Sequence, residues 1–217
     1  MKIIRLDVPE DGLAAPDASA WGQVPEREFP LVPTPLQGNP GIKAVSPFLE
    51  KSTDHGRVAR LHAAAAHNGK VLAVRLRWNA SGRDRIIDLD QFVDGVAVMF
   101  PLSAGASAVT MGSPSDPVNA WYWKGNLAQK AFDVVATGYG TSARSRDPAQ
   151  PIACTARYAA GEWQVVLRRA LKGTGDRVQL VPGAATGMAF AVWDGANRER
   201  SGRKSFSGDF VTVPIAS

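Results

Sequence analysis

Short runs of alternating apolar and polar residues, separated by turn residues, make up most of the chain after residue 50. A period of two is typical of strands that bury one face. Only the segment around 125–131 could form a short helix. The pattern therefore predicts an all-β fold with minor helix, its strands lying at 57–66, 71–78, 92–100, 118–124, 132–138, 152–158, 162–171, 187–193 and 209–215.

Two turn motifs indicate how these strands pair. Asn68–Gly69 separates two apolar runs, and Gly161 occupies a second hairpin turn. In the strand at 71–78, one face carries apolar side chains and the other carries Arg75 and Arg77. Strands without crossover helices bury their apolar faces against a second sheet, so we expect an antiparallel β-sandwich.

The first 50 residues differ from the rest because they hold eight of the chain's 15 prolines. Proline disfavours helix interiors and central strands, so this density predicts an extended arm packed on the domain. A chain of 217 residues that is 45% hydrophobic suits one globular unit. We expect an arm at 1–50 and a sandwich at 51–217 within a single domain.

Charge and cysteine content exclude several classes of protein. The net charge is +5, but the 25 Lys and Arg are interspersed with 20 Asp and Glu, so nucleic-acid binding is not expected. Cys154 is the only cysteine, which excludes an intrachain disulfide, covalently attached haem and cysteine-held clusters. No apolar stretch predicts membrane insertion, and the N-terminus lacks the apolar core of an export signal.

No catalytic motif is present in the sequence. The patterns GxSxG, HExxH, GxGxxG and the P-loop are all missing, so we do not expect an autonomous enzyme. His62 and His67 are five residues apart on a predicted strand and point to opposite faces, which disfavours a zinc or bis-histidine site. Together with His55, they are expected at the surface or at a sheet edge.

The strand at 92–100 has one face of mostly small residues, formed by Val93, Gly95, Ala97 and Met99. Small side chains beside a methionine leave room for a flat ligand. A thioether is a soft ligand that suits haem iron and raises its reduction potential. The commoner role of a methionine is to fill a gap in the core, and the strand alone leaves both roles open.

Lys204 lies in the segment RERSGRKSFSGD, whose glycines, serines and basic residues are typical of a solvated turn. As an iron ligand the lysine would have to be neutral. Removing its proton at pH 7 costs about 4–5 kcal/mol from an ordinary pKa of about 10.4. Only a dry pocket could offset this cost.

The segment VNAWYWK places Asn119, Trp121 and Trp123 on one strand face and Tyr122 with Lys124 on the other. Its rings could flank a porphyrin or a sugar. Packing in the core of a sandwich is the commoner use of such rings.

Four longer segments carry a resemblance to a known family: VSPFLE, FVDGVAVMFP, AVTMGSPSDPVNAWYWK and FAVWDGANRERSGRKSFSGDF. Together they resemble the gamma subunit of ethylbenzene dehydrogenase and related type II enzymes of the dimethyl sulfoxide reductase family, from about residue 30 to the end. The resemblance implies a β-sandwich related to carbohydrate-binding modules, with non-covalent haem b held by a Met and a Lys. Those ligands map to Met99 and Lys204, with Met111 of AVTMG as the fallback.

The resemblance also implies a non-catalytic electron-transfer subunit of a molybdenum dehydrogenase. Its partners would be an iron–sulfur beta subunit, a molybdopterin alpha subunit and an external acceptor such as a cytochrome. Periplasmic residence is implied, with export alongside a partner.

We take five further residues as candidate haem contacts, the arginines among them for the propionates: Arg75, Arg77, Asn119, Trp121 and Arg203. The alternative function is a haem-free sandwich that binds a glycan or another ligand through Trp121, Tyr122 or Trp123.

Overall fold

The computed structural model describes residues 1–127, 129–144 and 151–217 and forms the nine predicted strands. These strands are β4 (Arg60–His67), β5 (Val71–Asn79), β6 (Gly95–Pro101), β7 (Val118–Lys124), β8 (Lys130–Ala136), β10 (Ile152–Ala159), β11 (Glu162–Ala170), β12 (Ala185–Trp193) and β14 (Val211–Pro214). Shorter strands add to them: β1 (Ile4–Arg5), β2 (Arg27–Pro30), β3 (Val32–Pro33), β9 (Ala143–Arg144) and β13 (Ser205–Phe206).

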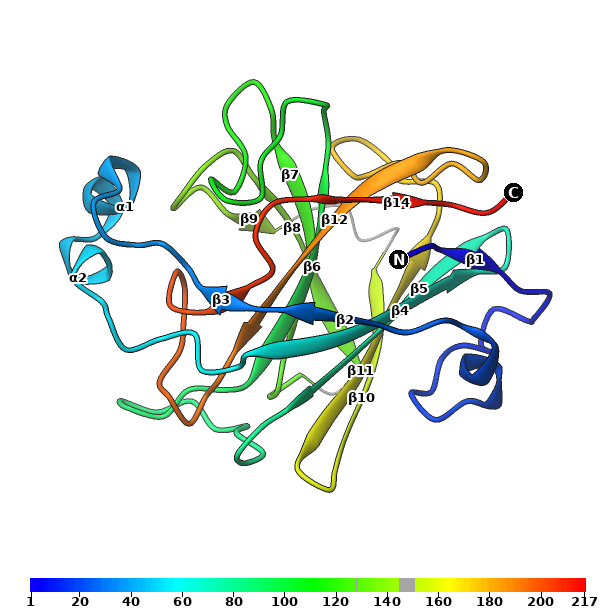
Figure 1. Ribbon diagram of the computed structural model, residues 1–217, viewed down its shortest axis with the longest axis horizontal. Coiled ribbons are helices and arrows are strands. Elements are labelled where there is room, and N and C mark those ends of the chain that lie inside the picture. The colour runs from blue at the N-terminus through cyan, green and yellow to red at the C-terminus, as the bar shows by residue number, and fades with distance from the viewer. Residues whose placement is uncertain (128, 145–150) are drawn as a thin grey trace.

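The strands form two layers of one curled sheet, which confirms the predicted sandwich (Figure 1). A bridge between Ile3 and Ile215 joins the layers at one edge. In the first layer β4 pairs with β5, β5 with β11 and β11 with β10, while β1 and β2 flank β4. In the second layer the order is β8, β7, β6, β12, β13 and β3, with β14 also on β12. A short ladder between β10 and β8 connects the layers.

The core lies between the layers, where the period-two pattern directs every second side chain. Leu72, Val74, Leu76 and Trp78 of β5 meet Val96, Val98 and Phe100 of β6 in one buried cluster. The ring centroids of Trp123 and Trp163 are 4.9 Å apart in that cluster. Because these positions face inward, the alternate residues of each strand face outward. Different segments of the chain cover the outer faces of the two sheets.

The first 50 residues cover parts of both outer faces. Leu13, Trp21 and Val24 pack on the alanines of β4 and β5 that face away from the core. The chain then crosses the molecule through β2 and β3 to two short helices over the second sheet, α1 (Pro40–Val45) and α2 (Pro47–Glu50) (Figure 1).

Helices in this proline-rich arm are a departure from the expected extended chain. Besides α1 and α2, a 3₁₀ turn η1 forms at Ser19–Gln23. Both α-helices have proline in their first turn, where the missing N–H has no intrahelical partner to lose. Asn39 and Ser46 cap them by accepting backbone N–H bonds. Among the described residues, no helix has the length and apolarity needed to cross a membrane.

The short helix expected around 125–131 is wrong for the residues described there, and residue 128 lies outside them. Gly125 and Asn126 form a turn, and β8 begins at Lys130. The Gly125 N–H donates to the Asp94 carbonyl at 2.7 Å, and a Cβ there would lie 2.7 Å from the Asp84 carbonyl oxygen. The tight approach of two backbones therefore prevents a helix.

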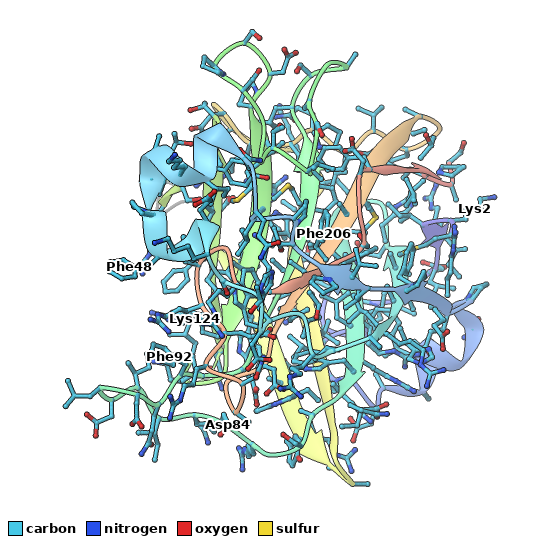
Figure 2. All side chains as sticks on the ribbon, turned by 60° about the vertical axis from the view of Figure 1, so that its left-hand side comes forward. Lys2, Phe48, Asp84, Phe92, Lys124 and Phe206 are labelled. Atoms are coloured by element: carbon cyan, nitrogen blue, oxygen red, sulfur yellow. The ribbon has the colours of Figure 1, made fainter. Side chains whose placement is uncertain are left out.

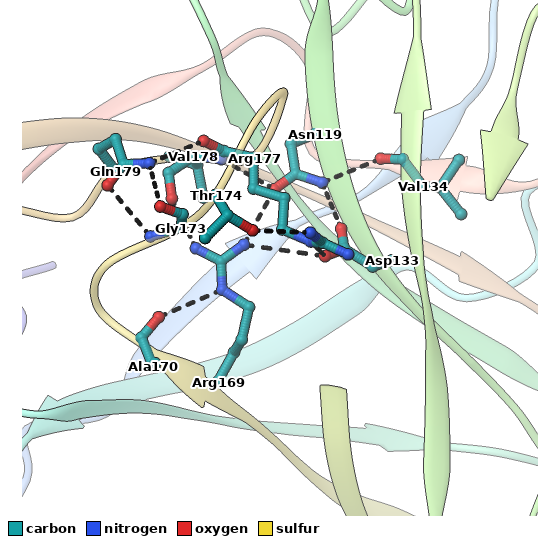
Figure 3. A network of polar contacts seen from close by, with 10 residues as sticks. All are labelled: Asn119, Asp133, Val134, Arg169, Ala170, Gly173, Thr174, Arg177, Val178 and Gln179. Carbon is teal, nitrogen blue, oxygen red and sulfur yellow. Dashed lines mark hydrogen bonds and ion pairs between the residues drawn. The ribbon is translucent and has the colours of Figure 1, made fainter. Parts of the chain in front are cut away.

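Buried charges connect the sheets near the β7–β8 ladder (Figure 3). Asp133 accepts bonds of 2.5 Å from both Asn119 Nδ2 and Arg177 Nε. Arg169 donates to the Val178 carbonyl, and its guanidinium is 3.9 Å from Asp133. Burial lowers the pKa of Arg169 to about 10, while the Asp133 carboxylate acts in the opposite direction. The network holds a loop onto the sandwich rather than forming an open site.

Replacing Asp133 should test this network. Asp133→Asn removes the charge that two buried guanidiniums share, so we expect the free energy of unfolding to fall by about 3–5 kcal/mol. Asp17→Asn is the matched control, because Asp17 pairs with Arg157 at 3.0 Å on the exposed surface, where ion pairs contribute little. Urea denaturation of both variants measures the difference, and equal losses would contradict a structural role for the buried network.

Candidate functional site

A cavity of about 420 Å³ lies on the outer face of the second sheet. Small residues from three neighbouring strands form its floor, namely Ala97, Ala120, Ala189 and Ala191. Met99 lies among them. Ala191 is directly opposite Ala97 in the ladder, and Ala189 is opposite Met99. The small-residue face predicted from the 92–100 strand therefore opens onto a cavity in the size range of ligand sites.

The cover of the cavity comes from segments far apart in the sequence. Ile42, Val45 and Leu49 of α1 and α2 line it, as do Ala108 and Met111 of the loop between β6 and β7. Figure 2 shows Phe48 of α2 and Lys124 at the end of β7 on the same side of the molecule. The charged residues in the lining are all basic, namely Lys124, Arg144 and Lys204, and no Asp or Glu lines the cavity within the described part of the chain.

Lys204 is buried in this cavity, although its basic segment taken alone is typical of a solvated turn. The residue is 7% exposed and directly precedes β13, whose Phe206 lies opposite Ala191. Its Nζ is 3.8 Å from Sδ of Met111 and 5.4 Å from the ring centroid of Trp193. No carboxylate pairs with it among the described residues, and burial lowers its pKa to about 8.

The loop that carries Lys204 is held by buried polar contacts. Glu199 is 1% exposed and accepts bonds from the backbone N–H groups of Gly56, at 2.6 Å, and Asp194, at 3.1 Å. The Lys204 carbonyl accepts from the N–H of Thr34 in the arm at 3.0 Å. These bonds connect the loop to distant segments, which keeps the lysine dry. Nothing in the basic segment around Glu199 predicts from the sequence that this residue is buried.

Met111 occupies a strained backbone position opposite Lys204. Its φ is +59°, a conformation that non-glycine residues rarely adopt. The Met111 carbonyl accepts a 3.0 Å bond from Gly138, and the next residue, Gly112, could not carry a Cβ because one would lie 2.8 Å from a carbonyl oxygen. Asp209 fixes the same loop by accepting from the Ala108 N–H at 2.8 Å. Strain of this kind is concentrated at functional sites.

Both candidate methionines therefore line the cavity with Lys204, but their positions differ. Met99 is part of the floor on β6, between Ala120 and Ala189 in the ladders. Met111 belongs to the cover and contacts the lysine nitrogen. The pair of Met99 and Lys204 as iron ligands stays a prediction. The 3.8 Å contact between Met111 Sδ and the lysine nitrogen favours Met111, the fallback methionine.

The other predicted cofactor contacts lie outside the cavity lining. Arg75 and Arg77 lie on the outer face of the first sheet, where both pair with Glu26. Arg203 donates to the Asp54 carbonyl. Asn119 belongs to the buried ionic network, and Trp121 is fully buried in the core. Each of these five residues therefore has a polar partner or a packing role outside the cavity, although the sequence suggested a contact with the cofactor.

The aromatic residues proposed to stack on a sugar are divided between the core and the cavity. Trp121 and Trp123 are 0% and 1% exposed in the core, so neither ring can stack on a sugar. Tyr122 faces the cavity, where it lies 4.7 Å from Trp193 between ring centroids. The period-two alternation of β7 explains the division.

The histidines do not form a metal site in the described part of the chain. His55 and His67 are buried against the carbonyls of Thr34 and Ala216, which corrects their expected surface placement. His62 is half-buried beside Glu26. Within the described residues, one group of three potential metal ligands is present, Asp84, Asp94 and Asp194, with one carboxylate oxygen of each within 4.8 Å of the others.

Asp94 of this trio has a structural role at the start of β6. Its carboxylate accepts bonds from Trp163 Nε1 at 2.7 Å and from the N–H groups of Gly195 and Asp84 at 3.0 Å each. Burial raises the pKa of Asp94 to about 6, although these bonds act in the opposite direction. The carboxylate therefore fastens two loops to the sheet.

Solved structures with this fold include a family 9 carbohydrate-binding module from Caldicellulosiruptor kristjanssonii in complex with glucose. It matches with a TM-score of 0.56 and 11% identity, over 100% of this chain and 95% of its own. At that identity the likeness concerns the fold alone, and it confirms the expected similarity to carbohydrate-binding modules.

Sequence comparison connects the chain to oxidoreductase subunits. A Haloferax mediterranei protein named as a respiratory nitrate reductase heme subunit is 33% identical over 91% of this chain and 67% of its own length. The chlorate reductase gamma subunit of Ideonella dechloratans is 30% identical over 94% of this chain and 81% of its own. The ethylbenzene dehydrogenase family matches residues 18–150 and 142–205, which confirms the resemblance seen in the motifs. The chain belongs to the ethylbenzene dehydrogenase family.

Proposed function

We propose that the chain binds one haem b non-covalently in the cavity, where Lys204, as a neutral amine, and Met111 would be the residues that hold its iron. The observation that carries the proposal is the buried Lys204 Nζ, which has no counter-ion among the described residues and faces a thioether at 3.8 Å. An amine and a thioether are both competent ligands of haem iron. A relative named as a heme subunit supports the choice of cofactor.

The surroundings of Lys204 suit the neutral form that coordination requires. With a pKa of about 8, deprotonation at pH 7 costs about 1–2 kcal/mol, against about 5 kcal/mol for an ordinary lysine. The apolar walls that cause this shift also exclude water from the amine. A bond between the amine and a metal therefore has only this small cost of deprotonation to offset.

Each side chain has a separate task in this site. Haem b supplies reversible one-electron exchange when bound. The Met111 thioether favours the reduced metal and so raises the reduction potential. Ala97, Ala120 and Ala191 leave the floor flat enough for a planar ligand.

The chain acts as a non-catalytic subunit of an oxidoreductase complex. We propose that it passes electrons between an iron–sulfur beta subunit, beside a molybdopterin alpha subunit, and an external acceptor such as a cytochrome. The direction of flow depends on whether the complex oxidises or reduces its substrate. We further propose that this complex resides in the periplasm, reached by export with a partner subunit.

Reconstitution with haem tests cofactor binding and the amine ligand together. The wild-type chain should give a stoichiometric low-spin b-type spectrum with sharp bands on reduction. Lys204→Gln should lose this spectrum or bind haem at least tenfold more weakly, because the amine is gone. Lys2→Gln is the control, because Lys2 is exposed and lies at the right of Figure 2, away from Phe48 and Lys124. A colourless wild-type protein, or an unchanged Lys204 variant, would refute the proposal.

The two methionines can be separated by matched leucine variants. Met111→Leu should lower the reduction potential of bound haem and change its ligand-sensitive absorption, because a thioether ligand is lost. Met99→Leu keeps the volume of the floor and should leave both properties close to wild type. Redox titration of the two proteins measures this, and the reverse ranking would assign the ligand to Met99.

A further inference from the structure

Two basic side chains line the opening of the cavity, and neither has a counter-ion among the described residues. Lys124 is at the end of β7, and Arg144 is in β9. Both line the cavity, and the charge of Arg144 is one cause, after burial, of the lowered pKa of Lys124. Arg144 is exposed and Lys124 is half-buried, so the pair lies where the cavity meets solvent.

Neither residue has an acidic partner in the part of the chain that the structure describes. By contrast, Arg75, Arg77, Arg157 and Arg198 each pair with a carboxylate. The Arg144 guanidinium instead lies 3.7 Å from the centroid of the Phe132 ring, which orients it along the cavity wall. Two cations that line one cavity repel each other, so an anion bound at the cavity opening would stabilise both.

From these contacts we infer that Lys124 and Arg144 form a carboxylate-binding site that anchors the acidic edge of the cavity's ligand. The inference rests on the proposed function, since it assigns these residues to the two propionates of a porphyrin. Arginine and lysine bind carboxylates through charge-assisted hydrogen bonds. An otherwise apolar cavity whose charged lining residues are all basic matches a flat apolar ligand with acidic groups on one side.

The ladder positions place this site at a suitable separation from the proposed iron ligands. Trp193, whose ring lies near Lys204 Nζ, is opposite Gly95, and Gly95 is opposite Lys124. Two strand intervals correspond to about 10 Å across the floor. Lys124 therefore lies at the other end of this row from the proposed iron ligand, whereas Arg144 ends the row that runs through Met99, Ala120 and Val134. The two cations can thus reach the acidic edge of one ligand from two rows of the cavity wall.

Iron-free protoporphyrin IX and its dimethyl ester test the inference without axial ligation. Fluorescence titration of the wild-type chain should give at least tenfold tighter binding of the diacid. In Lys124→Gln/Arg144→Gln that preference should fall to near unity, whereas Lys124→Arg should keep it. The unfolding midpoint of each variant reports whether the fold is intact.

The possible outcomes separate this inference from the haem proposal. If the wild-type chain binds haem but does not distinguish diacid from ester, the carboxylate site is refuted and the haem site stands. If the preference is lost in Lys204→Gln but kept in the double variant, the anchor is Lys204 and the inference is wrong. If neither porphyrin nor haem binds, both proposals fail.

Discussion

The desolvation of one lysine is the constraint on which the site depends. Lys204 lies among apolar side chains with a sulfur atom as its nearest polar contact, so its charge is poorly compensated. Keeping it there requires buried bonds from Glu199 and a contact from the arm through Thr34. A fold that only needed a turn before β13 would gain nothing from burying this amine. The arrangement is explained if the neutral nitrogen coordinates a metal.

The sandwich forms the cavity around Lys204 because successive side chains along each strand point to opposite faces of the sheet. Large side chains of β6, β7 and β12 fill the core, and the small residues between them form the cavity floor. The proline-rich arm then covers that floor with α1 and α2. The same fold occurs in carbohydrate-binding modules, so the fold alone does not determine the ligand.

Much of this could be predicted from the sequence, but not the long-range contacts. The nine strands and the small face of β6 follow from local periodicity. Lys204 and Met111 are 93 residues apart, and no local pattern reports that they meet. The arginines at 75 and 77 illustrate the converse problem, because their partner Glu26 belongs to the arm. Lys124 and Arg144 were missed as a pair because they lie on β7 and β9, and the pairing of both strands with β8 is not visible in the sequence.

The central claim is that one metal lies between an amine and a thioether in this cavity. A crystal structure of the haem-loaded chain tests it most directly. We expect iron within bonding distance of Nζ of Lys204 and Sδ of Met111, with α1 and α2 still lining the occupied cavity. Haem bound outside the cavity, or iron held by a histidine, would contradict it.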